Sequence, residues 1–405
     1  MKKKILLLGG SAQQIIAIKA AKKLGYYTIL CDYLVDNPGQ KYADKFYLAS
    51  TTNVDEIFKI AKFEKIDGII SYASDPAAPT AAYIAEKLNL ISNSYESVST
   101  LCDKSKFRNF LLNNGFNTPK SIASRNTNNI TEMISDFKFP LIVKPVDSSG
   151  SKGVTVISSK TELLDASKYA LKFSRTGKYI IEEYIQKGYP YLIGGDILVV
   201  NGEIKIWGLM NCHRDSFVNS LVPVGKSYPI NVNPTVYENI QNVLKKIVSL
   251  LKFNNGALNV ELIVDKNNKI WPIDIGPRSG GNMIPELMNY IFNVNMAEIL
   301  IKIAMGDKVE VEVNNSEACY ASHNIHSSRK GYLKRIDYSK ELKQFIIQKV
   351  IYKQKGALIE PFENASKVIG ILFFKFDTVA DMYKYLSDIN KHIKVELDEF
   401  NQGEE

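Results

Sequence analysis

Two carboxylates on neighbouring apolar runs are the residues best placed to do chemistry in this sequence. Glu261 lies in the run Ala257–Val264, and Asp274 lies in the next run, Lys269–Ile275, after the short connection Asp265–Asn268. If that connection is a hairpin turn, the two carboxylates lie near each other across the strand pair. Their repulsion would be relieved by a divalent cation that also binds nucleotide phosphates. The alternative is an exposed hairpin with scattered charges, but the apolar neighbours of Glu261 favour the metal site.

A cation and a short polar segment follow the second carboxylate. Arg278 could stabilise negative charge on a phosphoryl group during its transfer. The next four residues precede a predicted helix, and free N–H groups ahead of a helix are a usual place for a carboxylate. We therefore expect this segment to hold a substrate carboxylate. Its residues are Ser279, Gly280, Gly281 and Asn282.

A lysine in an apolar strand and the flexible loop after it favour a phosphate site. Lys144 lies in the run Pro140–Pro145, where burial of an ammonium group is costly unless it meets an anion. A lysine that reaches solvent from an edge strand is the alternative. The loop Asp147–Val154 is not a Walker motif, and alone it would be a hairpin connection. Beside Lys144, its N–H groups and hydroxyls favour phosphate binding.

Other polar residues are interpreted structurally. The turn Gly9–Ser11 lacks the G-x-G-x-x-G spacing, so a tight strand-to-helix turn is favoured over a dinucleotide site that would use Asp32. His323 and His326 are far in sequence from the segment Cys212–Asp215, and structural histidines are favoured over a zinc site. The segment around His213 and Arg214 could nevertheless face a substrate.

The elements that must position these residues follow from hydrophobic periodicity. Strand and helix patterns alternate through residues 1–100, which predicts parallel βαβ units in a doubly wound sheet. Asp75 is expected to cap a helix over Pro76–Leu88, and Asp103 a helix that ends at Asn114. A long amphipathic helix is predicted over Asn233–Phe253.

Composition limits the classes of protein. The chain has 405 residues, of which 45% are hydrophobic and 23% charged, so a folded globular protein is expected. No apolar run is long enough to span a bilayer. The net charge of +8 is spread among acids, which fits an anionic small molecule and gives little support for nucleic acid. Four cysteines without a C-x-x-C pair indicate a reducing compartment, the cytoplasm.

In this order the segments resemble the ATP-grasp superfamily of carboxylate–amine ligases, over almost the whole chain. The resemblance is to amino-acid ligases and to carbamoyl-phosphate-synthase-like and phosphoribosylglycinamide-synthetase-like members. It implies an α/β protein of ATP-grasp fold. Residues 1–100 would form a pre-ATP-grasp domain with a doubly wound parallel sheet, and 101–310 the grasp domain with a lid at about 118–187. Residues 311–405 would form a C-terminal α+β segment packed on the grasp domain.

The resemblance implies how ATP is held. The segment Cys102–Arg108 is similar to the family's D-K-x-x-x-R helix start, so Lys104 would contact a nucleotide phosphate, as would Lys144. The mobile glycine-rich loop would close over the β- and γ-phosphates. The segment Ile181–Ile185 resembles the hinge, in which Glu182 would accept a bond from the adenine amino group. The implied ATP-binding residues of the loop and hinge are Ser148, Ser149, Gly150, Ser151, Gly153, Val154, Glu182, Glu183, Tyr184 and Ile185.

The metal site resembles that of the family with two departures. Glu261 and Asp274 match its metal-binding acids, and Arg278 the arginine of its E-x-N-P-R segment. Asp274 stands where the family usually has Glu, and Gly276 where it has an Asn ligand. The G-x-E that usually holds the ribose hydroxyls is replaced by Gly188–Tyr191.

The implied reaction is ligation of a small carboxylate to an amine. ATP with Mg²⁺ or Mn²⁺ would convert the carboxylate, expected to be an amino acid, into an acyl phosphate, which the amine attacks. Lys144 and Arg278 would be the catalytic residues. Three alternatives stay open: a ligase of surface-polysaccharide or purine intermediates, an ATP sensor without turnover, and a dinucleotide-dependent enzyme. The expected partners are small molecules, with neither nucleic acid nor membrane, and a homodimer is left open.

Overall fold

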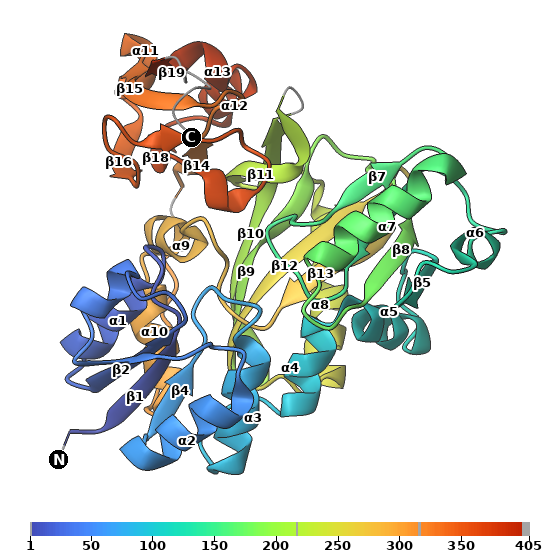
Figure 1. The fold of residues 1–405 in the computed structure, drawn as a ribbon. Coiled ribbons are helices and arrows are strands. Elements are labelled where there is room, and N and C mark those ends of the chain that lie inside the picture. Colours follow the sequence, from blue (N-terminus) through green and yellow to red (C-terminus); the bar gives the residue numbers. More distant parts are fainter. Residues whose placement is uncertain (1, 216–217, 315–316, 399–405) are drawn as a thin grey trace.

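The computed structural model describes residues 2–215, 218–314 and 317–398. Residues from the N-terminal hundred form a four-stranded parallel sheet in the order β3-β2-β1-β4, with helices on both faces. The elements are β1 (Lys4–Leu8), α1 (Ile15–Lys23), β2 (Tyr27–Asp32), β3 (Lys45–Leu48), α2 (Val54–Glu64), β4 (Gly68–Ile70) and α3 (Ala78–Lys87). The predicted doubly wound sheet is confirmed, and Figure 1 shows it in blue.

A second four-stranded sheet lies between residues 121 and 183 in the order β5-β8-β6-β7. Its strands pair antiparallel, and α7 covers its apolar face. Two helices, α4 and α5, lead into it from the N-terminal sheet. The elements are α4 (Tyr95–Cys102), α5 (Lys104–Asn113), β5 (Ser121–Ser124), α6 (Ile130–Met133), β6 (Leu141–Pro145), β7 (Thr155–Ile157), α7 (Leu163–Lys172) and β8 (Tyr179–Glu183).

The largest sheet has eight strands in the order β13-β12-β9-β10-β11-β14-β18-β16. The long helix α8 (Pro234–Leu250) packs its apolar side against this sheet, as its periodicity predicted. The strands are β9 (Leu192–Val200), β10 (Glu203–Asp215), β11 (Asn219–Tyr228), β12 (Gly256–Val264), β13 (Ile270–Gly276), β14 (Cys319–Ile325), β16 (Ile346–Ile351) and β18 (Gly370–Phe376). Three of them come from the C-terminal segment, which therefore extends the large sheet as well as packing against it.

The rest of the C-terminal segment forms a small sheet in the order β17-β15-β19 with short helices. Figure 1 shows this segment in orange and red at the end of the large sheet. The remaining elements are α9 (Ile284–Phe292), α10 (Met296–Ala304), β15 (Gly331–Tyr338), α11 (Lys340–Lys343), β17 (Leu358–Ile359), α12 (Val379–Ser387), α13 (Ile389–His392) and β19 (Ile393–Asp398). No helix in the described parts of the chain is both long and apolar enough to cross a bilayer.

The two predicted helix caps have different outcomes. Asp103 caps α5, because its side chain accepts bonds from the N–H groups of Ser105 and Lys106. The expectation for Asp75 is wrong. α3 begins at Ala78 without a side-chain cap, and the Asp75 carboxylate pairs with Arg278 instead.

Candidate active site

A cleft of about 900 Å³ lies between the sheet β5-β8-β6-β7, the large sheet and the N-terminal unit. Of the nineteen residues predicted for the site, all but three line it. Those that line it are Lys104, Lys144, Ser148, Ser149, Gly150, Ser151, Val154, Glu182, Glu183, Tyr184, Ile185, Glu261, Asp274, Arg278, Gly281 and Asn282. Gly153, Ser279 and Gly280 are not among the lining residues. Segments more than one hundred residues apart in sequence thus meet in one place.

The two candidate metal acids face each other. Glu261 on β12 and Asp274 on β13 are direct cross-strand partners, so the predicted hairpin pairing is confirmed. A β-bulge follows Glu261 in this pair. Within the described residues no group of three or more His, Cys, Asp or Glu is arranged to hold a metal ion. Two carboxylates fit Mg²⁺ only where nucleotide phosphates and water supply its other ligands, which is the usual arrangement for this ion.

Each of these acids is paired with a cation. The Glu261 carboxylate accepts a bond from Arg214 of β10. Asp274 lies 3.3 Å from the ammonium of Lys104, which also donates to the Ser148 carbonyl at 3.0 Å. Burial would raise the pKa of Asp274, but Lys104 and Lys144 together hold it below its ordinary value. The charged form of Asp274 is therefore favoured, and each of the two carboxylates contacts a cationic side chain.

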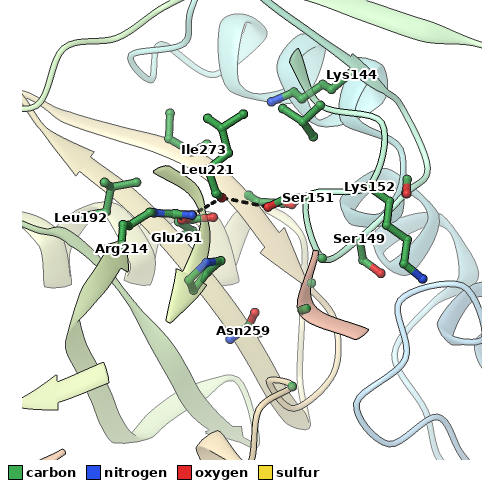
Figure 2. Close-up of a pocket in the computed structure, with 18 of the residues that line it drawn as sticks. Lys144, Ser149, Ser151, Lys152, Leu192, Arg214, Leu221, Asn259, Glu261 and Ile273 are labelled. Atoms are coloured by element: carbon green, nitrogen blue, oxygen red, sulfur yellow. Dashed lines mark hydrogen bonds and ion pairs between the residues drawn. The ribbon is translucent and has the colours of Figure 1, made fainter. Parts of the chain in front are cut away.

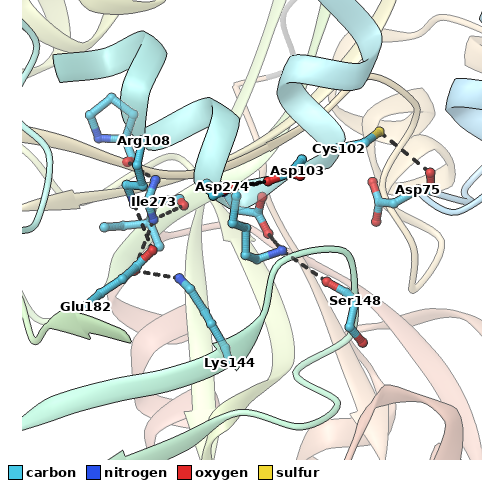
Figure 3. A network of polar contacts seen from close by, with 12 residues as sticks. Asp75, Cys102, Asp103, Arg108, Lys144, Ser148, Glu182, Ile273 and Asp274 are labelled. Carbon is cyan, nitrogen blue, oxygen red and sulfur yellow. Dashed lines mark hydrogen bonds and ion pairs between the residues drawn. The ribbon is translucent and has the colours of Figure 1, made fainter. Parts of the chain in front are cut away.

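Lys144 belongs to a buried trio of charges. Its ammonium lies 2.7 Å from Glu182, whose carboxylate also accepts bonds of 2.9 and 3.2 Å from Arg108 of α5. Figure 3 shows Glu182 between these two cations. Burial would raise the pKa of Glu182, but Arg108 and Lys144 lower it to about 2. Burial lowers the pKa of Lys144, against the effect of Glu182.

This trio changes the interpretation of Glu182. Both of its carboxylate oxygens already accept bonds from cations, so their geometry does not support the expected contact with an adenine amino group. The carboxylate instead contacts the Lys144 ammonium at 2.7 Å. Its neighbour Glu183 accepts a bond from the N–H of Lys138, and the backbone from Glu183 to Ile185 lines the cleft.

The glycine-rich loop joins β6 to β7 and turns sharply. Gly150, Ser151 and Gly153 all have positive φ angles, of 66°, 61° and 74°. The Ser151 hydroxyl donates to the Leu221 carbonyl of β11 at 2.9 Å. Gly153 is packed so closely that an added Cβ would lie 2.9 Å from Pro145. Gly153 therefore shapes the loop, whereas the residues before it face the cleft.

The N-terminal unit reaches the cleft through Asp75. Its carboxylate pairs with the Arg278 guanidinium, which also donates to the Ser279 carbonyl at 2.9 Å. Burial would lower the pKa of Arg278, but Asp75 raises it. A Cβ on Gly276 would lie 2.4 Å from an Asp75 oxygen. A side chain at position 276, such as the Asn expected from the resemblance, would therefore collide with the Asp75 carboxylate of the N-terminal unit.

Two of the four expected N–H groups after Arg278 already donate to side chains of the protein. The Gly280 N–H donates to the buried Asp196 carboxylate at 2.8 Å, and the Asn282 N–H donates to Gln13 at 2.6 Å. The Ser279 side chain is buried and accepts a bond from the Ala73 N–H at 3.3 Å. The predicted carboxylate site is therefore wrong for the N–H groups of Gly280 and Asn282, whose bonds fix the loop instead.

The structural interpretations of the other polar motifs agree with their contacts. The Gly10 N–H donates to Asp32 at 2.7 Å, and the Ser11 N–H donates to Gln14 at 2.8 Å, so both N–H groups are bound by side chains of the N-terminal unit. The His213 ring lies 2.8 Å from the Ser227 hydroxyl. Burial lowers the pKa of His213 to about 4.

The polar residues that line the cleft and were given no site role from the sequence include Asp75, Arg214 and Asn259. Arg108, beneath the cleft, belongs to this group too, although the D-K-x-x-x-R pattern contained it. Arg214 was noted only as a residue that could face substrate. Nothing in the local sequence around Asp75 or Asn259 distinguishes them from ordinary polar loop and strand residues.

Comparison with known proteins extends these observations. A family profile described as "ATP-grasp domain" matches residues 137–286. The formate-dependent phosphoribosylglycinamide formyltransferase of Prochlorococcus marinus (strain NATL1A) is 33% identical over 318 residues, which cover 75% of this chain and 77% of that protein. The carbamoyl phosphate synthase large chain of Pseudothermotoga lettingae is 23% identical over 76% of this chain, which spans only 29% of that protein.

Solved structures share the fold over nearly the whole chain. The L-amino acid ligase of Bacillus licheniformis has a TM-score of 0.81 at 18% identity, with 98% of this chain and 99% of that chain covered. The phosphoribosylglycinamide synthetase of Anaerococcus prevotii has a TM-score of 0.74 at 24% identity, with 98% and 100% covered. The fold, the 33% identical relative and the family profile agree: this chain belongs to the ATP-grasp family and is an ATP-dependent, ADP-forming ligase.

Proposed function

We propose that this chain uses Mg·ATP to convert a small carboxylate, most simply an amino acid, into an acyl phosphate that an amine then attacks to form an amide. ADP and phosphate are released. The observation that carries the proposal is the meeting of Lys104, Lys144, Glu261, Asp274 and Arg278 in one cleft. Phosphoryl transfer needs mainly positioning and neutralisation of charge, which these residues can supply without a protein nucleophile.

Each residue has a part in this proposal. Lys144 and Lys104 neutralise phosphate charge, and the Ser148–Ser151 segment covers the phosphates. Glu261 and Asp274 would hold Mg²⁺, which supplies further neutralisation of the phosphate oxygens when bound. Arg278 orients the substrate carboxylate towards the γ-phosphorus, because a guanidinium matches a carboxylate with two parallel bonds.

The paired charges of Arg278 and Asp75 support an amino acid as the donor. The two side chains contact each other at the wall of the cleft, one positive and one negative. An α-amino acid carries the complementary pair, a carboxylate and an ammonium group. Such a substrate could replace the contact between Arg278 and Asp75 by one bond to each. An L-amino acid ligase is also among the proteins that share the fold.

Formate is a second candidate donor. The 33% identical relative is named as a formate-dependent formyltransferase, and the chain covers 77% of it. Formate would need Arg278 but has no ammonium group for Asp75. The two candidates therefore differ in the part that Asp75 plays.

Coupled measurement of ADP release tests the proposal. The protein is supplied with Mg·ATP, an amine mixture and one acid at a time from a library of amino acids, sugar acids and formate. ADP release should depend on one class of acid and should be lost for the most part in Arg278→Lys, which should still bind ATP. Nucleotide binding without release for any acid would instead favour the sensor. Full donor-dependent release in Arg278→Lys would refute the role of Arg278.

A further inference from the structure

Arg214 lies at an irregular point of the large sheet. It is near the end of β10, and the register between β10 and β11 shifts both before it and after it. Its partner across the strands is Pro223, which has no N–H to contribute to the ladder. Bulges redirect side chains and are frequent beside active sites. Here the shifts accompany a guanidinium that lines the cleft.

The Arg214 side chain joins two parts of the proposed ATP site. One guanidinium nitrogen bonds to the Glu261 carboxylate, and the other donates to the Leu221 carbonyl. The same carbonyl accepts the bond from Ser151 of the glycine-rich loop. Figure 2 shows this chain of contacts from Glu261 through Arg214 and Leu221 to Ser151. The guanidinium is therefore located between the candidate metal acid and the loop.

A metal ion bound at Glu261 would weaken the contact between Glu261 and Arg214. A divalent cation at Glu261 supplies the neutralising charge that Arg214 supplies in its absence, and the two cations repel each other. A guanidinium group has a positive charge that favours contact with another anion once its carboxylate partner is lost. If ATP binds as proposed, its phosphate chain would lie between Glu261 and the loop and would be the nearest new anion. A guanidinium has the donors to bind two oxygens of one phosphoryl group.

We propose that Arg214 is a further catalytic residue, which leaves Glu261 when Mg·ATP binds and contacts the γ-phosphoryl group during its transfer. The inference rests on the proposed function in that it places ATP in this cleft. It extends that function by assigning Arg214 a contact present with a triphosphate and absent with a diphosphate. Loss of the side chain should therefore affect the two nucleotides differently.

Titration calorimetry on Arg214→Gln tests this assignment without an acyl donor. The dissociation constants of Mg·ADP and of a Mg-bound, non-hydrolysable ATP analogue are measured for wild type and variant. Mg·ADP should bind the variant as tightly as it binds wild type or more tightly, because Arg214 no longer competes with Mg²⁺ for the Glu261 carboxylate. The analogue should bind about tenfold more weakly, and donor-dependent ADP release should fall about a hundredfold.

Matched variants separate this role from a structural one. Arg335→Gln removes a guanidinium from an exposed ion pair with Glu396 and should change neither constant. Arg214→Lys keeps the positive charge but cannot donate two parallel bonds to one phosphoryl group. Its preference for the triphosphate over the diphosphate should therefore lie between those of wild type and Arg214→Gln. If Arg214→Gln does not fold, the test uses Arg214→Lys alone. Its preference for the ATP analogue over Mg·ADP should then be lower than that of wild type.

Two outcomes would overturn the proposal. One is an equal loss of affinity for both nucleotides, which would mark Arg214 as a structural support of the cleft. The other is an affinity for each nucleotide equal to that of wild type. A failure of the proposed ligase function has a different signature, since it leaves the nucleotide constants measurable and abolishes only the ADP release that depends on a donor.

Discussion

Lys144 and Glu182 form a buried ion pair in which only the lysine is expected to meet the nucleotide. Removal of one member of a buried pair usually costs about 3–5 kcal/mol of folding stability because the other charge is left alone. In this protein Arg108 also bonds to Glu182, so that carboxylate would stay neutralised without Lys144. Effects on ATP binding and on stability can therefore be separated at this position.

Lys144→Met should weaken ATP binding by about 2–5 kcal/mol, because a desolvated phosphate contact is lost. Its free energy of unfolding without ligand should fall by less than the usual cost of breaking a buried pair, since Arg108 remains. Titration calorimetry and urea denaturation measure the two quantities. Wild-type affinity for ATP in this variant would contradict the role given to Lys144.

Asp75→Asn should impair the use of the acyl donor while leaving ATP affinity unchanged. An amide binds a guanidinium less strongly than a carboxylate does, so Arg278 loses the charge that orients it. With an amino-acid donor, the KM for the donor should rise, and with formate it should rise less. Steady-state ADP release with each donor makes the comparison.

Asp55→Asn is the matched control for this change, because Asp55 is exposed on α2 and away from the cleft. It should leave both KM values unchanged. An equal effect of Asp75→Asn on ATP affinity and on donor KM would instead mean that Asp75 supports the whole cleft.

At the level of elements, the start of α5 connects helix capping to the site. Asp103 is the N-cap, and Lys104, which contacts Asp274 and Ser148, is the first residue of the helix. Asp103→Ala should lower the free energy of unfolding by about 1 kcal/mol. It should also weaken ATP binding, because the first turn no longer holds Lys104 in place.

A second N-cap provides the comparison for Asp103. Asn53 caps α2, which lies on the N-terminal sheet and contributes no residue to the cleft. Asn53→Ala should lower stability by a similar amount and leave ATP affinity unchanged. If both variants lose stability and neither loses affinity, α5 does not position Lys104 for the nucleotide.

Local sequence patterns predicted the elements of the site better than the contacts between them. The pairing of Glu261 with Asp274 and the cap at Asp103 could be predicted, because each depends on residues close in sequence. The contact of Arg214 with Glu261 joins residues 47 positions apart, and that of Asp75 with Arg278 joins residues 203 apart. Such contacts depend on how separate units pack, which a hydrophobic pattern does not encode.

The pairing of strands from distant parts of the sequence was hard to predict for the same reason. Strand β11 and the bulges around Arg214 escaped prediction, because β-bulges depend on register between strands. The joining of β14, β18 and β16 to the large sheet also escaped it. The sequences of these strands do not indicate which strand each of them pairs with. Their order becomes defined only when the C-terminal segment packs beside β11.

For the molecule as a whole, a buried acid lies where separate units converge. Glu286 on α9 is only 7% exposed, and one of its carboxylate oxygens has no hydrogen-bond partner within the described part of the chain. Its charge influences Tyr72 of the N-terminal unit and Tyr352 of the C-terminal segment. Burial, together with Asp196, raises the pKa of Glu286 from 4.5 to about 7. Ionisation of this group therefore opposes the packing of all these units.

The stability of the protein should consequently depend on pH through Glu286. Because its pKa is higher in the folded state, the folded state binds more protons than the unfolded state between pH 4.5 and about 7, and the free energy of unfolding falls as pH rises through that window. The fall amounts to about 3 kcal/mol and is complete above the folded pKa. Glu286→Gln cannot ionise, so its stability relative to wild type should rise by most of that amount between about pH 5 and about pH 8. Urea denaturation across this range measures the difference, with Glu238→Gln on the exposed side of α8 as the control that should show no trend. A difference between Glu286→Gln and wild type that does not change with pH would show that Glu286 keeps an ordinary pKa in the folded protein.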